Sequence, residues 1–224
     1  METEKKITQT TDNNLKRMGV FGGTFDPIHY GHLMIAENAR EQYSLDQVLF
    51  IPTGHSPLKH KQQITDSVHR CMMVSKAIAD HMQFALHRIE VHSQEISYTF
   101  RTIEMLKENY KNTELFFILG ADSLFDFESW RNPELIVKNC SILAAYREHK
   151  RQEEFFLHLS YLNEKYPGKF YPLDTPSLDV SSHEIRNRVQ DQKTIRYLVP
   201  KVVEDYIWEH KLYKSDTTQH SGRP

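Results

Sequence analysis

Two histidines lie three residues apart in a glycine-containing run that follows an apolar stretch. The run reads Gly-Gly-Thr-Phe-Asp-Pro-Ile-His-Tyr-Gly-His, begins at Gly22 and places its histidines at His29 and His32. Glycines let the backbone approach a phosphate closely, and a helix that begins here offers N–H groups and a positive dipole end to an anion. The pattern therefore indicates a phosphate-binding turn in which two imidazoles take part.

Two other interpretations of this run are open. Asp26 and Pro27 could form a plain turn, with the histidines capping the next helix or packing in the core. The two histidines could instead ligate a metal, but a pair with no evident third ligand nearby makes a poor closed site. We favour phosphate binding and expect no metal site made by protein ligands.

A second polar run, Val-Ser-Ser-His-Glu-Ile-Arg, extends from Val180 to Arg186 at the start of a predicted helix. Ser181 or Ser182 can cap this helix, and taken alone a serine followed by glutamate is a routine capping signal. Arg186 lies one turn into the helix. There a guanidinium and the helix N-terminus together could clamp the β- and γ-phosphates of ATP.

The elements that must position these motifs alternate between strands and helices. Runs such as Leu-Phe-Phe-Ile-Leu are apolar on both faces, which is typical of parallel strands covered by helices, and ligands of such sheets bind at the carboxyl ends of the strands. We predict an α/β protein with a Rossmann-like, doubly wound parallel sheet. The predicted strands are 18–21, 47–51, 84–91, 115–119, 141–146 and 170–173, and the predicted helices lie around 35–43, 68–80, 99–110, 152–165, 182–190 and 200–213.

Composition limits the partners and the compartment. Lys and Arg total 28 against 30 Asp and Glu, so nothing drives nonspecific binding to nucleic acid. We expect a cytoplasmic protein, because the polar N-terminus lacks a signal sequence and no apolar run reaches membrane-spanning length. Cys71 and Cys140 are expected to be buried free thiols. Residues 18–213 should form one domain, with flexible polar ends at 1–17 and 214–224.

At these motifs the chain resembles the HxGH nucleotidyltransferase superfamily. The run from Gly22 to His32 reproduces its signature, and the run from Val180 is similar to its ISSTxxR motif, with valine for isoleucine and His183 for threonine. The resemblance implies the nucleotidyltransferase type of Rossmann-like fold, with His29, His32 and Arg186 as catalytic groups. The ATP-binding residues that it implies are Gly22, Gly23, Thr24, Phe25, Gly31, Lys59, Ser181 and Ser182, although Lys59 could equally be an exposed loop lysine.

Segments away from the phosphate motifs are similar to the nicotinate-mononucleotide branch of that superfamily. By this resemblance Trp130 stacks on the pyridine ring, Thr99 and nearby amides hold its carboxylate, and Asp122 contacts the ribose region. Gly120 and Arg147 complete the implied acceptor site. The segment around Trp130 is polar and is expected to be mobile when the site is empty.

The implied reaction moves AMP from ATP to nicotinate mononucleotide. A phosphomonoester with a second pKa near ~6 is already a nucleophile at neutral pH, so no catalytic carboxylate is needed, and Mg²⁺ should arrive with the triphosphate. Nicotinamide mononucleotide or phosphopantetheine as acceptor remains an alternative, as does a non-catalytic nucleotide sensor of the same fold. The expected partners are ATP and the mononucleotide, without nucleic acid or membrane, and a homo-oligomer is left open.

Overall fold

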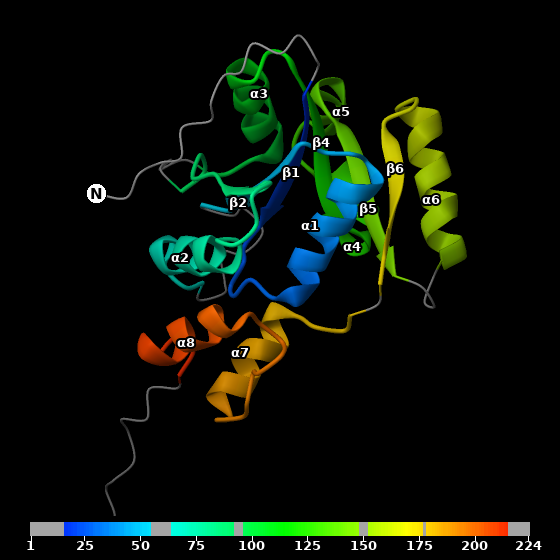
Figure 1. Cartoon of the computed structure of the whole chain (residues 1–224). Helices are drawn as coiled ribbons and strands as arrows, with labels where there is room; N and C mark the ends of the chain where they lie inside the picture. Colours follow the sequence, from blue (N-terminus) through cyan, green and yellow to red (C-terminus); the bar gives the residue numbers. More distant parts are fainter. Residues whose placement is uncertain (1–15, 55–63, 92–95, 148–151, 177, 215–224) are drawn as a thin grey trace, which may run out of the picture.

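The computed structural model describes residues 16–54, 64–91, 96–147, 152–176 and 178–214. In these parts of the chain, six parallel strands form one sheet in the order β3-β2-β1-β4-β5-β6, with helices on both faces (Figure 1). The predicted doubly wound α/β fold is therefore confirmed. The strands are β1 Lys16–Gly23, β2 Gln47–Pro52, β3 Phe84–Leu86, β4 Thr113–Gly120, β5 Ser141–Arg147 and β6 Phe170–Thr175. The helices are α1 Tyr30–Gln42, α2 Ser67–Ala77, α3 Thr99–Asn109, α4 Ala121–Phe125, α5 Pro133–Asn139, α6 Gln152–Lys165, α7 Ser182–Gln190 and α8 Lys201–Glu209, with a 3₁₀ turn η1 at Phe127–Ser129.

The two faces of the sheet bury separate apolar clusters. Val20 and Phe117 pack in a cluster with residues of α3, α4, α5 and α6, whereas Phe21 and Phe116 pack in a cluster with residues of α1, α2, α7 and α8. Both faces are covered, which is why the strands are apolar at successive positions. The strand order reverses between β1 and β4, and in such sheets this switch point is where ligands bind.

The bounds of several elements agree with the sequence prediction and others do not. α6 and α7 begin and end at the predicted residues. β3 ends at Leu86 and not at residue 91, because only three of its residues pair with β2 before the chain turns. α8 ends at Glu209, after which Lys211 and Tyr213 have positive φ angles of 53° and 62°.

The segment after β4 differs most from the prediction. The sequence indicated a polar, mobile stretch around Trp130, but α4, η1 and α5 follow one another here. The side chains of Leu124 and Phe127 are fully buried. These elements are too short to carry a periodic signal, and burial of their few apolar side chains holds them in place. No helix was predicted between β4 and β5, so these elements add to the predicted fold, and mobility of the segment in the empty site stays a prediction.

The start of β1 and the two cysteines can also be compared with the sequence prediction. Lys16 and Arg17 pair with β4, so β1 includes two residues that the prediction placed in the N-terminal extension. The expectations for residues 1–15 and 215–224 lie outside the described residues. Cys71 and Cys140 are buried and free, as predicted, and burial raises the pKa of Cys140 to about 12. Among the described residues, no helix is long and apolar enough to cross a membrane.

Candidate active site

The two motif histidines lie side by side where the turn after β1 leads into α1. His29 is the N-cap residue of α1 and is 5% exposed, and its ring stacks on that of His32 with centroids 3.7 Å apart. The backbone N–H of His29 donates to Nδ1 of His32 at 3.3 Å. Because Nδ1 accepts this bond, the neutral His32 ring carries its proton on Nε2. His32 can therefore donate from Nε2 to a phosphate oxygen.

Two glycines of the motif make room for aromatic rings. A Cβ atom at Gly31 would lie 3.0 Å from Nδ1 of His29, and one at Gly23 would lie 3.0 Å from the Phe25 ring. Phe25 is 1% exposed and meets His32 edge to face, with ring centroids 5.0 Å apart. Its φ of 49° is left-handed. The glycines thus permit the ring packing that orients both histidines, a role that the sequence did not indicate.

The start of α7 lies against the same turn. Ser181 caps α7 through the N–H of Glu184 at 3.1 Å, and the hydroxyl of Ser182 donates to the carbonyl of Pro27 at 2.9 Å. Nη1 of Arg186 donates to the carbonyl of Asp26 at 2.8 Å. Figure 1 shows α7 just beyond the start of α1. The structure therefore brings both predicted motifs together, with the guanidinium oriented by the turn that carries the histidines.

Asp26 anchors this turn from within. It is 4% exposed, accepts from the hydroxyl of Tyr213 at 2.7 Å and accepts from the N–H of Thr65 at 3.2 Å. Burial, reinforced by the negative charge of Asp26, raises the pKa of Tyr213, so this phenol stays protonated and donates. Tyr213 was not predicted as a site residue, because a tyrosine near a chain end gives no sequence signal.

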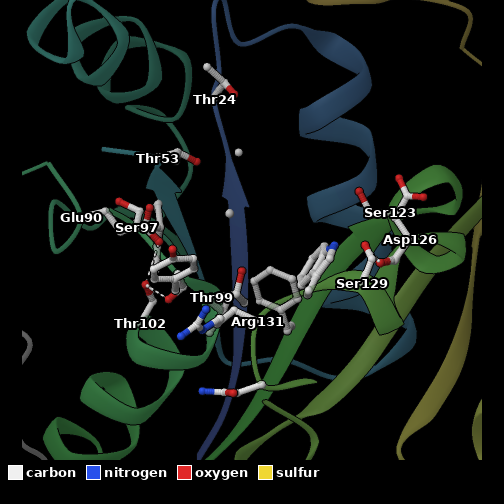
Figure 2. Close-up of a pocket in the computed structure, with 18 residues that line it drawn as sticks. Thr24, Thr53, Glu90, Ser97, Thr99, Thr102, Ser123, Asp126, Ser129 and Arg131 are labelled. Atoms are coloured by element: carbon white, nitrogen blue, oxygen red, sulfur yellow. Dashed lines mark hydrogen bonds between the residues drawn. The ribbon is translucent and has the colours of Figure 1, made fainter. Parts of the chain in front are cut away.

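A cavity of about 770 Å³ opens beside the motif at the switch point between β1 and β4 (Figure 2). Figure 2 shows Glu90, Ser97 and Thr102 along one side, Ser123, Asp126 and Ser129 along the other, and Thr24 at one end. The cavity is lined by Val20, Gly22, Gly23, Thr24, Ile51, Thr53, Glu90, Ser97, Tyr98, Thr99, Thr102, Phe117, Ser123, Asp126, Ser129, Trp130, Arg131 and Asn132. Residues predicted for ATP and for the acceptor thus line one space.

Trp130 and Thr99 face this cavity from two elements on the same side of the sheet. Trp130 is half-buried and packs edge to face on Phe117, with ring centroids 6.0 Å apart, and also against Phe127 at 5.5 Å. Thr99 is the first residue of α3. A supported indole and a helix N-terminus suit an aromatic ring that carries an anionic group.

The other predicted acceptor residues are not brought into the cavity lining. Gly120 ends β4 and Asp122 lies exposed in the first turn of α4, so both are near the same sheet edge, yet neither lines the cavity. Arg147 is the last residue of β5, and its side chain lies outside what the structure describes. Lys59 also lies outside the described residues.

Several polar residues of the site were missed from the sequence. The hydroxyl of Thr102 donates to Oε1 of Glu90 at 2.8 Å, and burial raises the pKa of this glutamate. The guanidinium of Arg131 lies 5.9 Å from the centre of the Tyr98 ring. Glu90 follows a short edge strand and gave no signal. Within the described residues, no three His, Cys, Asp or Glu side chains are grouped so as to hold a metal ion.

A doubly wound parallel sheet with a turn containing glycines and histidines beside a cavity at its switch point is typical of nucleotide-binding α/β proteins. A family model described as cytidylyltransferase-like matches residues 20–188. A Lachnoclostridium phytofermentans protein named "Probable nicotinate-nucleotide adenylyltransferase" is 37% identical over 199 residues, covering 89% of this chain and all of the relative. A Thermoanaerobacter protein of the same name is 39% identical over 201 residues, covering 89% of this chain and 95% of the relative.

A solved structure with a similar fold is named for the same activity as these relatives. The Plasmodium falciparum nicotinic acid mononucleotide adenylyltransferase complexed with NaAD has a TM-score of 0.73 and 25% identity, covering 88% of this chain and 97% of that one. The chain belongs to the nicotinate-nucleotide adenylyltransferase family of the cytidylyltransferase-like nucleotidyltransferases.

Proposed function

We propose that this enzyme transfers AMP from ATP to nicotinate mononucleotide, forming nicotinate adenine dinucleotide and pyrophosphate in NAD biosynthesis. One observation carries the proposal: the cavity shares Gly22, Gly23 and Thr24 with the histidine motif and has Trp130 and Thr99 in its lining. The family relatives support it, because their names specify this activity and one solved structure is a complex with NaAD.

The donor side stabilises charge as pyrophosphate leaves. His29 and His32 contact the α- and β-phosphates of ATP, with Nε2 of His32 as donor. Arg186 and the capped start of α7 hold the β- and γ-phosphates, alongside Ser181 and Ser182. A divalent cation, Mg²⁺, travels with the triphosphate and is held largely by phosphates and water. Positioned donors of this kind lower the barrier without acid–base chemistry.

The acceptor side orients the attacking phosphate. Trp130 stacks on the pyridine ring, while Thr99 and the N-terminus of α3 hold the ring carboxylate. Asp122 contacts the ribose region of the mononucleotide, and Gly120 and Arg147 belong to the same proposed acceptor site. The mononucleotide phosphate, largely dianionic at neutral pH, attacks the α-phosphorus in line, and the bond to the pyrophosphate oxygen breaks. No covalent enzyme intermediate forms.

Pyrophosphate release from ATP tests this proposal. Nicotinate mononucleotide, nicotinamide mononucleotide and phosphopantetheine are offered separately, and we expect the first to give the highest kcat/KM. His32→Ala should lower kcat by about 10²-fold, the usual loss for one charge-stabilising donor. A protein that binds ATP but releases no pyrophosphate with any acceptor would be a nucleotide sensor, and the enzyme proposal would fail.

A further inference from the structure

Arg70 is a buried cation on the core-facing side of α2. It is 2% exposed and shares its helical face with Met73, Val74 and Ala77, which are buried apolar residues. Burial lowers the pKa of Arg70, and the negative charge of Asp26 partly opposes that effect. Placing a guanidinium in such surroundings is costly, and an apolar side chain of similar size is often at least as stabilising. The presence of a buried arginine at this position therefore needs an explanation other than a contribution to folding stability.

The three guanidinium nitrogens of Arg70 each donate to a backbone carbonyl from a different segment. Nη1 donates to Thr24 at 2.8 Å, Nη2 to Thr53 at 2.8 Å and Nε to Thr65 at 2.9 Å. Thr24 follows β1 and leads into the histidine turn, Thr53 follows β2, and Thr65 precedes α2. One planar side chain thus joins the exits of two adjacent strands to the loop before α2.

Two of these carbonyls belong to residues that line the cavity at the switch point between β1 and β4. Thr24 and Thr53 both face it, and Thr24 is adjacent in sequence to Phe25, which packs on His32. The third residue, Thr65, donates its N–H to Asp26 in the same turn. Arg70 consequently contacts the backbone that orients the histidines and the backbone that shapes the cavity.

The contacts continue from the exit of β2 to α3. A Cβ atom at Gly54 would lie 2.2 Å from the carbonyl oxygen of Glu90, so the two backbones are in close contact. The carboxylate of Glu90 accepts from Thr102 of α3 at 2.8 Å. Movement at the exit of β2 would therefore shift the start of α3, where Thr99 lies.

We propose that Arg70 is a positioning residue that fixes the histidine turn relative to the acceptor cavity and thereby sets the rate of adenylyl transfer. In-line transfer needs the attacking oxygen within roughly 3–3.5 Å of the phosphorus, and a misplacement of about 1 Å can cost about 10²-fold in rate. Arg70 does not line the cavity, and its three nitrogens all donate to backbone carbonyls. The proposal rests on the proposed function only in assuming that both substrates occupy these neighbouring regions.

Two substitutions at position 70 test the proposal. Arg70→Lys keeps the charge but places its donors on a single nitrogen, which cannot reproduce the planar fork that spans three chain segments. Arg70→Met keeps an unbranched, apolar stem while removing both the charge and the donors. Val74→Ala is the matched control, because it weakens the same buried helix face without touching the bridged carbonyls. Each protein is assayed for Tm, for binding of ATP and of nicotinate mononucleotide separately, and for kcat.

The proposal predicts a separation of kcat from binding and from stability. Both Arg70 variants should lose about 10²-fold in kcat, with each Kd within about threefold of wild type, and Val74→Ala should lower Tm but keep kcat. Unchanged kcat in a folded Arg70 variant, a kcat that follows Tm across the three proteins, or failure of both Arg70 variants to fold while Val74→Ala folds would overturn it. Failure of the proposed function would instead appear in the wild-type enzyme, as absent turnover with nicotinate mononucleotide.

Discussion

Gly31→Ala should lower the activity of the enzyme, while helix propensity and crowding of His29 act on its stability in opposite directions. The backbone of Gly31 is helical, and alanine in a helix is more favourable than glycine by up to about 1 kcal/mol. For a protein of this length, that gain alone would correspond to an increase in Tm of roughly 2–4 °C, and displacement of the buried His29 ring opposes it. The added methyl would, however, lie 3.0 Å from Nδ1 and 3.1 Å from Cε1 of His29.

The imidazole of His29 must therefore move by a few tenths of an ångström or more. It is buried and stacked on His32 at 3.7 Å, so the shift is transmitted to the second histidine. Because a misplacement of about 1 Å costs about 10²-fold, we expect kcat to fall between about 10-fold and 10²-fold, or roughly 1.4–2.7 kcal/mol of barrier.

Pyrophosphate release at saturating substrates measures kcat, and thermal unfolding of the same samples measures Tm. Asn38→Ala is the control, because it also raises helix propensity in α1 but lies away from the histidines. That variant should keep full kcat. Wild-type kcat in a folded Gly31→Ala protein would refute the argument that the ring packing of His29 governs turnover.

Three further substitutions test other parts of the site. Trp130→Ala should raise KM for nicotinate mononucleotide by about 10-fold or more, since stacking contributes about 0.5–1.5 kcal/mol beyond area burial. It should leave KM for ATP unchanged. The control variant Trp208→Phe should leave KM for both substrates unchanged. Arg186→Ala should weaken ATP binding more than mononucleotide binding; the reverse order in titrations would show that the phosphate clamp is misassigned. Burial raises the pKa of Glu90, so its stabilising contribution is complete below the ordinary glutamate pKa and is lost as pH rises through the folded value. The Tm of Glu90→Gln relative to wild type should therefore increase as pH rises above the ordinary glutamate pKa, and a difference that is constant with pH would contradict the raised pKa.

The sequence alone predicted the fold class and the two phosphate motifs. Strands such as β4 are apolar at successive positions because both faces of the sheet are covered, and this pattern is visible without coordinates. α6 and α7 have amphipathic patterns and clear boundaries, and their predicted bounds were confirmed. The motif at Gly22 could be recognised because its residues are contiguous in the chain.

Contacts between distant segments could not be predicted in this way. Arg70 could have been noticed as a charge on an apolar helix face, but its carbonyl partners at residues 24 and 53 depend on how β1 and β2 end beside α2. Glu90 lines the cavity in a segment whose backbone packs closely on Gly54, just after β2. α4, η1 and α5 are too short for a periodic pattern and depend on burial of Leu124 and Phe127.

Features that the sequence predicted depend on interactions between residues close in the chain, and features that it missed depend on contacts between distant segments. Local sequence determines hydrophobic period, capping and contiguous motifs, because these depend on residues within a few positions of one another. Family resemblance implied that Trp130 and Thr99 share a site, but local sequence patterns did not, since these residues and the end of β1 come from segments separated by long stretches of chain that meet at one cavity. Their proximity is set by the packing of α3 and of the segment from α4 to α5 over the same face of the sheet, and local sequence preference does not encode it.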